Sequence, residues 1–200
     1  MRHKPVGSLS RSLGIPVSPA GAKVLEERSY RPGQHGRRRH ELSEYGRRLR
    51  EKQRLRAQYF ISEKQLRRYF EEASRRGGRT DDNLVRDLER RLDAVVLRSG
   101  FAKSVYQARQ LVTHGHVLVN GKRLDRPAAR LTDGDFIQIK EGSREMPVFV
   151  AAREQAHVDS TPPYLEVYPN ALLSRVLRDA ERAEVPIICD VQLVVEYYAR

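Results

Sequence analysis

The chain has 200 residues, of which 32% are charged and 39% hydrophobic, and its formal net charge is +12. This length accommodates two small domains or one larger one, and the charge favours a polyanionic partner such as nucleic acid. The single cysteine, Cys189, excludes an intrachain disulfide and a cysteine-based zinc site. No run of about 18 apolar residues occurs. We therefore expect a cytoplasmic protein with no signal peptide and no membrane partner.

Positive charge is concentrated in the first two fifths of the chain. Residues 1–80 hold 21 Lys and Arg against 8 Asp and Glu, whereas the remaining 120 residues hold 17 against 18. A second basic stretch, residues 103–123, contains no acidic residue. The sequence therefore predicts two basic surfaces.

Residues 1–42 are rich in Gly, Pro, Ser and Arg and have no sustained periodicity. We expect them to form an extended basic arm that is poorly ordered unless a partner holds it. Within it, Pro-Gly at 32–33 predicts a turn, and three consecutive arginines at 37–39 can neutralise phosphates that converge at a folded RNA junction. The alternative is a solvated basic tail.

Two helices are expected between Ser43 and about residue 76. The i,i+4 pair Tyr45 and Leu49 indicates the first, and Ser62 with Gln65 has the spacing of a capping box that begins the second. Arginines crowd the remaining surface of both helices.

A third helix is expected from an N-cap at Asp81 or Asp82 to a stop at Gly100. A shorter helix should begin at Ser104 and end near residue 113, where His-Gly-His follows. The chain then changes to strand-like patterns.

Asn120-Gly121 lies between two short strand-like runs, which is the strongest short signal for a β-hairpin. A turn at Asp133-Gly134 precedes another strand at 136–140. Residues 88–152 are therefore expected to fold as a small α+β module of two helices, a hairpin and further short strands.

After residue 160 the chain returns to apolar segments, and Asp190 is a candidate N-cap for a last helix. Neither this tail nor the helices of 43–87 has a full core alone. We expect segments 43–87 and 160–200 to form one discontinuous, mainly helical domain with the module inserted into it. The predicted class is α+β.

Three segments of the module resemble the S4 RNA-binding module in order and spacing. They are Leu-Glu-Arg-Arg-Leu-Asp-Ala-Val-Val at 88–96, Ala-Arg-Gln-Leu-Val at 108–112, and His-Gly-His-Val through Asn-Gly at 114–121. The same module occurs in tyrosyl-tRNA synthetases, pseudouridine synthases and a heat-shock protein of stalled ribosomes. This resemblance alone therefore implies RNA binding and no particular activity.

Three further segments narrow the resemblance to bacterial ribosomal protein S4. They are Pro-Gly-Gln-His-Gly at 32–36, Ser-Glu-Tyr-Gly with Leu-Arg-Glu-Lys-Gln within 43–53, and Leu-Val-Val-Glu-Tyr-Tyr at 193–198. Their order is that of the family, and the resemblance spans about residue 28 to the end. Some members hold zinc with N-terminal cysteines. This chain has none there and is similar to the metal-free form, so no metal and no cofactor are expected.

The resemblance implies a structural protein of the small ribosomal subunit, not an enzyme. It implies early binding to a helix junction in the 5′ domain of 16S rRNA during subunit assembly. It further implies contact with ribosomal protein S5 and neighbouring small-subunit proteins near the place where mRNA enters, with an effect on translational accuracy. Some members repress their own mRNA. No homo-oligomer is expected.

The candidate rRNA-binding residues carry basic or hydrogen-bonding side chains that can reach phosphates and 2′-hydroxyls. In the first part of the chain they are Arg31, Gln34, His35, Arg37, Arg38, Arg39, Tyr45, Arg47, Lys52, Arg54, Arg56, Lys64, Arg67, Arg68 and Arg75. In the module they are Lys103, Ser104, Gln107, Arg109, Gln110, His114, His116 and Lys122. Glu196, Tyr197 and Tyr198 are expected to contact another protein.

Alternative interpretations exist for two motifs. His114 and His116 could complete a helix end, and a His-x-His metal site is disfavoured because no Cys, third His or helical carboxylate pair lies nearby. Arg-Leu-Asp at 91–93 superficially matches the Arg-Leu-Asp of pseudouridine synthases. Its position on an amphipathic helix predicts instead that Asp93 is a surface or capping carboxylate.

Two other function classes stay open beside the ribosomal one. The first is an RNA-modifying enzyme that carries the S4 module, although no domain of catalytic size remains outside the regions assigned above. The second is a ribosome-associated stress or translational-control factor that uses the same module.

Overall fold

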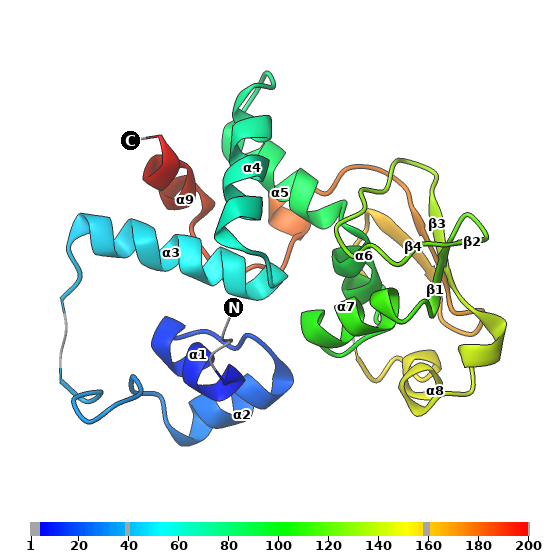
Figure 1. Cartoon of the computed structure of the whole chain (residues 1–200), viewed down its shortest axis with the longest axis horizontal. Helices are drawn as coiled ribbons and strands as arrows, with labels where there is room; N and C mark the ends of the chain where they lie inside the picture. The colour runs from blue at the N-terminus through cyan, green and yellow to red at the C-terminus, as the bar shows by residue number, and fades with distance from the viewer. Residues whose placement is uncertain (1–4, 39–40, 158–160, 200) are drawn as a thin grey trace. The chain divides into compact units, whose positions relative to one another are not determined.

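The computed structural model of the chain describes residues 5–38, 41–157 and 161–199 (Figure 1). Two compact units emerge: unit 1 comprises Met1–Arg75 and Ile187–Arg200, and unit 2 comprises Arg76–Pro186. Unit 1 is thus built from both ends of the chain. The expected helical domain was 43–87 with 160–200; unit 1 also includes the segment before residue 43, whereas 76–87 and the tail up to residue 186 belong to unit 2.

The N-terminal part of unit 1 is helical where an extended arm was predicted. Helix α1 spans Val6–Leu13 and α2 spans Pro19–Glu27. The two helices approach closely at Gly21, where an added Cβ would lie 2.2 Å from Oγ of the buried Ser10. Small residues, which in the sequence indicate a loop, therefore allow α1 and α2 to pack closely here.

Three further helices complete unit 1: α3 (Glu44–Tyr59), α4 (Glu63–Ser74) and α9 (Val191–Tyr198). The predicted caps are confirmed, since Ser62 and Gln65 form a reciprocal capping box and Asp190 accepts backbone N–H groups at the start of α9. Helix α9 packs on α3, where Glu51 accepts the backbone N–H of Asp190 at 3.0 Å and Gln58 accepts that of Ile188 at 2.8 Å.

Unit 2 begins with α5 (Thr80–Glu89), α6 (Leu92–Arg98) and α7 (Val105–Thr113). The single helix predicted from Asp81 or Asp82 to Gly100 is wrong, because the chain breaks at Arg91, whose backbone is extended at φ −70° and ψ 140°. The backbone N–H groups of the next two residues donate to carbonyls of Ala129 and Pro127 at 2.8 and 3.1 Å. A distant loop thus takes the hydrogen bonds that a continuous helix would have used.

The sheet of unit 2 is antiparallel in the order β2-β1-β3-β5-β4. Its strands are β1 (Val117–Val119), β2 (Lys122–Arg123), β3 (Phe136–Ile139), β4 (Leu165–Tyr168) and β5 (Leu173–Val176). Asn120 and Gly121 have φ of 49° and 76°, as a two-residue hairpin turn requires, so the predicted hairpin is confirmed.

The residues that form β4 and β5 belong to the tail segment that was expected to complete the helical domain. Instead, β5 pairs with β3 in the sheet of unit 2. This pairing gives β3 hydrogen-bonded neighbours on both edges, and the side chains of Ile137 and Ile139 are buried. Two 3-10 helices, η1 (Glu141–Ser143) and η2 (Arg182–Glu184), and helix α8 (Pro147–Arg153) complete unit 2.

The described ranges contain nine α-helices and one five-stranded antiparallel sheet, so the predicted α+β class is confirmed. Within those ranges, no helix is both long and apolar enough to cross a bilayer.

Candidate RNA-binding surface

The ring of Tyr30 contacts two arginines of unit 1. The guanidinium carbons of Arg11 and Arg37 lie 4.7 and 4.9 Å from the centroid of its ring. Arg11 also donates from Nε to the carbonyl of Tyr30 at 2.9 Å and from Nη2 to that of Arg31 at 3.2 Å. Helix α1 therefore anchors the loop that carries Arg31 and Arg37.

Arg54 of α3 fixes the other side of this basic region. Its Nε donates to the carbonyl of Leu13 at 2.9 Å, and its Nη1 donates to Glu51 at 2.8 Å. Gly14, which ends α1 at φ 68°, lies beside it, since an added Cβ would lie 3.6 Å from Nη2 of Arg54 and 3.9 Å from Nη2 of Arg50. Arg50 and Arg54, which are i,i+4 neighbours on α3, thus both lie beside the end of α1.

Arg50 lies in a strongly positive environment. Partial burial lowers the pKa of Arg50, and the charges of Arg54 and Arg31 lower it further and outweigh the opposite effect of Glu51. Its Nε is buried and has no hydrogen-bond partner. Arginines that repel one another in this way favour a bound anion such as phosphate. We refer to Arg11, Arg31, Arg37, Arg50 and Arg54 as the arginine cluster.

A hollow of about 510 Å³ opens between α1 and α3 beside the arginine cluster. Its lining residues are Leu9, Ser12, Leu13, Arg31, Leu42, Gly46, Leu49, Arg50 and Gln53. Arg31 and Arg50 are the only charged members of this lining, so the hollow combines an apolar floor with two cationic groups.

Most other candidates of unit 1 are exposed. Gln34, His35 and Arg38 lie on the loop with Arg37, whereas Arg39 lies outside the described residues. The remaining exposed candidates are Tyr45, Arg47, Lys64, Arg67, Arg68 and Arg75. Arg67 and Arg68 are paired at i,i+4 with Glu71 and Glu72 at 3.1 and 3.7 Å.

Lys52 and Arg56, expected on the RNA-binding surface, lie instead within the packing of unit 1. The side chain of Lys52 is only 5% exposed, and its Nζ lies 3.0 Å from Glu63 and 4.1 Å from the ring centroid of Tyr197. Nη1 of Arg56 also lies 3.3 Å from Glu63. Lys52 therefore joins α3 to α4 and α9, and Arg56 joins α3 to α4.

In unit 2, a second hollow, of about 520 Å³, collects five module candidates. Its lining residues are Lys103, Gln107, Gln110, Leu111, His114, His116, Met146, Pro147, Val148, Ala151 and His157. The opposite wall, from α8, was missed because the short, mostly apolar segment 146–151 has no helical signal strong enough to place it. His157 is a third histidine at this hollow, although no three His, Cys, Asp or Glu side chains among the described residues lie so that they could hold a metal ion together.

His116 is fixed inside this hollow. Its Nδ1 lies 2.9 Å from Oγ of Ser143, and its ring meets Phe149 edge-on at 6.4 Å between centroids. Burial lowers the pKa of His116, and the charges of His114 and Lys140 lower it further. At neutral pH the His116 side chain is therefore a neutral hydrogen-bonding group. His114 differs in burial, since its side chain is exposed.

The start of α7 uses two candidates as caps. Oγ of Ser104 accepts the backbone N–H of Gln107 at 3.3 Å, and the side chain of Gln107 accepts that of Lys103 at 2.9 Å. Lys122 is exposed on β2. Arg109 of α7 is 27% exposed and donates to Asp93.

Asp93 accepts the backbone N–H of Ala94 in the first turn of α6, as a capping carboxylate does, but the alternative prediction that it lies at the surface is wrong. Its side chain is 1% exposed and pairs with Arg91 and Arg109 at 2.6 and 3.0 Å. The break before α6 turns this first-turn carboxylate inward, and a buried carboxylate requires such partners. Arg-Leu-Asp thus has a structural explanation.

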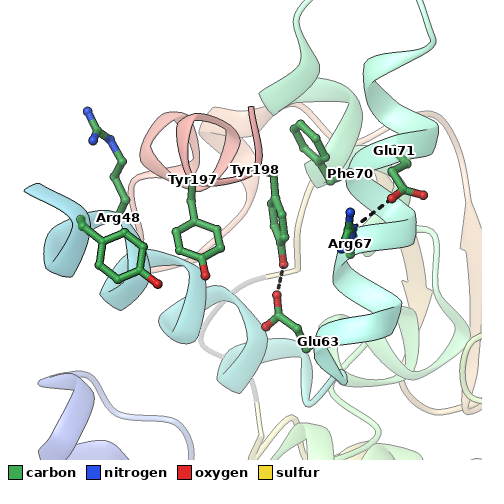
Figure 2. Close-up of a pocket in the computed structure, with 8 residues that line it drawn as sticks. Arg48, Glu63, Arg67, Phe70, Glu71, Tyr197 and Tyr198 are labelled. Atoms are coloured by element: carbon green, nitrogen blue, oxygen red, sulfur yellow. Dashed lines mark hydrogen bonds and ion pairs between the residues drawn. The ribbon is translucent and has the colours of Figure 1, made fainter. Parts of the chain in front are cut away.

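The three expected protein-contact residues lie on α9. Glu196 accepts from Nε of Arg48 at 2.8 Å. Tyr198 donates to Glu63 at 2.7 Å and stacks on Phe70 at 5.1 Å, as Figure 2 shows. Tyr197 and Tyr198 line a hollow of about 480 Å³, which we call the tyrosine hollow. Its lining residues are Tyr45, Arg48, Glu63, Arg67, Phe70, Glu71, Tyr197 and Tyr198.

Comparisons with known proteins match this chain to two family models and to several relatives. Residues 2–89 match the ribosomal protein S4/S9 N-terminal domain, and residues 90–137 match the S4 domain. The chain is 51% identical over 201 residues to small ribosomal subunit protein uS4 of Streptomyces avermitilis, and 53% identical over 201 residues to that of Paenarthrobacter aurescens. Each of these alignments covers 100% of this chain and 98% of the relative.

A third relative, uS4 of Clavibacter sepedonicus, is 54% identical over 195 residues, which cover 96% of this chain and 93% of the relative. These names confirm the prediction of a ribosomal structural protein rather than an enzyme. The chain belongs to the uS4 family of small ribosomal subunit proteins.

Proposed function

We propose that the chain binds the 5′ domain of 16S rRNA at a helix junction and nucleates assembly of the small ribosomal subunit. The observation that carries this proposal is the arginine cluster, in which five guanidinium groups from α1, α3 and the 31–37 loop gather around Tyr30 and Gly14. One carboxylate, Glu51, pairs with Arg54 there. The surplus charge matches a site where several phosphates meet.

The mechanism is electrostatic and geometric. Guanidinium groups replace the counterions condensed on RNA phosphates, and the released ions favour binding. Because Arg11, Arg37 and Arg54 are already fixed by ring and carbonyl contacts, little side-chain freedom is lost when RNA binds. The hollow of unit 2 adds amide and imidazole groups that can reach backbone and 2′-hydroxyls.

Filter binding to a fragment of the rRNA 5′ domain tests this proposal. The double variant Arg31→Ala/Arg50→Ala should bind at least about tenfold more weakly at moderate salt, because two phosphate contacts are lost. Arg79→Ala/Arg178→Ala is the matched control, since it removes the same charge from exposed arginines that are paired with carboxylates and are not rRNA-binding candidates. Equal affinities of the two double variants would contradict the proposal.

The arm is tested separately with Arg37→Ala/Arg38→Ala/Arg39→Ala in the same assay. Arg37 belongs to the arginine cluster through its contact with Tyr30, so the triple variant should also bind weakly. Unchanged affinity would remove the 37–39 segment from the mechanism.

We also propose that the tyrosine hollow contacts ribosomal protein S5 near the place where mRNA enters, and that this contact influences translational accuracy. The hollow exposes Tyr45 at 56% and carries two further tyrosine rings on α9, and aromatic residues are enriched at protein interfaces. Tyr45→Ala should weaken co-purification of ribosomal protein S5 with the chain. Unchanged co-purification would contradict the assignment.

We propose finally that the same rRNA-binding groups let the chain repress its own mRNA. A leader that folds into a similar junction would present the same converging phosphates to the arginine cluster. In a translation assay, Arg31→Ala/Arg50→Ala should relieve repression of a reporter fused to that leader, and the Arg79→Ala/Arg178→Ala control should not.

Sucrose-gradient sedimentation distinguishes a ribosomal structural protein from a ribosome-associated stress factor. A constitutive structural protein stays with small subunits in a sucrose gradient after a high-salt wash, whereas a factor leaves them.

A further inference from the structure

Asp93 links two arginines inside unit 2. Nε and Nη2 of Arg91 donate to its two carboxylate oxygens at 2.9 and 2.6 Å, and Nη1 of Arg109 donates to Oδ2 at 3.0 Å. The side chains of Arg91 and Asp93 are 0% and 1% exposed, whereas that of Arg109 is 27% exposed. The carboxylate therefore joins a fully buried arginine to one that reaches the surface.

The backbone holds this carboxylate in place. Oδ1 of Asp93 accepts the backbone N–H of Ala94 at 3.0 Å, and the backbone N–H of Asp93 donates to the carbonyl of Pro127 at 3.1 Å. Asp93 lies in the first turn of α6, and α6 packs directly on α7, which carries Arg109. The position of the Arg109 guanidinium is thus determined from α6 rather than from its own helix alone.

We propose that Asp93 is a positioning residue for RNA binding, which holds the guanidinium of Arg109 in the orientation that meets an RNA phosphate. This inference rests on the proposed rRNA-binding function. A guanidinium is planar and has five N–H donors in a fixed fork, so fixing one nitrogen also fixes the direction of the others. An arginine held in this way loses less side-chain freedom on binding than a mobile one.

Positioning and simple electrostatics predict opposite effects of removing the Asp93 charge. A carboxylate near the RNA-binding surface repels phosphate, so its neutralisation should strengthen RNA binding if charge alone matters. If Asp93 positions Arg109, the same neutralisation should weaken binding. The direction of the change therefore decides between the two explanations.

The test is the affinity of the full chain for the rRNA 5′-domain fragment, measured with Asp93→Asn, which keeps the shape of the side chain. The positioning role predicts about two- to tenfold weaker binding, the range expected when one immobilised side chain becomes mobile. In an Arg109→Ala background, Asp93→Asn should have no further effect. Equal or tighter binding of the single variant Asp93→Asn overturns the inference.

Glu89→Gln is the matched control for loss of a buried negative charge. The Glu89 side chain is 2% exposed in the same unit and pairs with Arg98 at 2.9 Å. This variant should bind RNA as tightly as the unmodified chain, or more tightly. A loss equal to that of Asp93→Asn would show that general damage to unit 2 is the cause, and would overturn the inference.

Arg109→Lys keeps the test decisive if circular dichroism shows that Asp93→Asn does not fold. Lysine retains the charge and can still pair with Asp93 but lacks the planar fork, so it should bind about two- to tenfold more weakly. Affinity equal to that of the unmodified chain overturns the inference. If the unmodified chain itself fails to bind the fragment, the proposed function fails. Loss of the positioning effect alone leaves that function standing.

Discussion

The ammonium group of Lys52 lies over the ring of Tyr197, 4.1 Å from its centroid, in the interior of unit 1. The same Nζ lies 3.0 Å from Glu63, so one cation ties α3 to both α4 and α9. Lys52 lies in a basic segment of the sequence, but its side chain stabilises the fold and is not part of the exposed basic surface.

Replacing Lys52 with methionine should lower stability and leave RNA affinity intact. The change removes one of the partners of Glu63 and the cation–π contact, and because Glu63 is 40% exposed and solvent screens its charge, the free energy of unfolding should fall by only about 1–2 kcal/mol. Urea unfolding measures this, with the exposed Lys64→Met as control. A stable variant that binds RNA weakly would contradict the assignment.

The pH dependence of stability should reveal Glu63. Partial burial raises the pKa of Glu63, but hydrogen bonds from Tyr198 and Lys52, with the charges of Lys52 and Arg56, outweigh it and place the pKa below 4.5. Because the folded pKa is the lower one, the carboxylate stabilises the fold above the unfolded pKa, about 4.3. That contribution is lost as pH falls through the folded pKa.

Unfolding of Glu63→Gln and the unmodified chain should therefore be compared between pH 3 and 7. The difference in their free energies of unfolding should be constant at neutral pH and shrink below about pH 4. A difference that does not change across this interval would show that the carboxylate charge is irrelevant.

The hairpin turn should depend on glycine at 121. Gly121 has φ 76°, so alanine there is strained, and Gly121→Ala should lower the free energy of unfolding by about 1 kcal/mol. Gly142→Ala is the control, since that glycine has open space and no positive φ. Thermal unfolding of the two variants checks this, and equal midpoints would mean that the turn tolerates a side chain.

The contact between α1 and α2 should be equally sensitive. In Gly21→Ala the new Cβ would lie 2.2 Å from Oγ of the buried Ser10, and the clash should cost about 1–3 kcal/mol. Because α1 carries Arg11, the variant should be cleaved faster by protease near residues 6–27 and bind rRNA more weakly. Gly77→Ala, which meets nothing within 4 Å, should leave both unchanged.

Local signals predicted local structure well. The Ser62 and Gln65 capping box, the Asp190 cap and the Asn120-Gly121 turn each depend on residues close in sequence, and the structure confirms all three. The break at Arg91 could not be found in this way, because it depends on hydrogen bonds to residues 127 and 129. The pairing of β3 with β5 is likewise a long-range choice.

The candidate RNA-binding residues divide in the same way, into those that local sequence predicts and those that depend on long-range contacts. Charge density correctly places exposed groups such as Arg37, Lys64 and Lys122, since their surroundings are mainly solvent. It could not distinguish Lys52, whose burial depends on Tyr197 at the far end of the chain. Arg50 belongs to the arginine cluster but was not selected, because its proximity to Arg31 arises only when α1 folds against α3.

The salt dependence of rRNA binding tests the central claim most directly, because it reports how many phosphates the protein contacts. For the unmodified chain, the logarithm of the association constant should fall linearly with the logarithm of the salt concentration. Arg31→Ala/Arg50→Ala should reduce the magnitude of that slope by about 1 to 2, close to one for each lost phosphate contact. An unchanged slope would mean that the arginine cluster does not touch the RNA backbone.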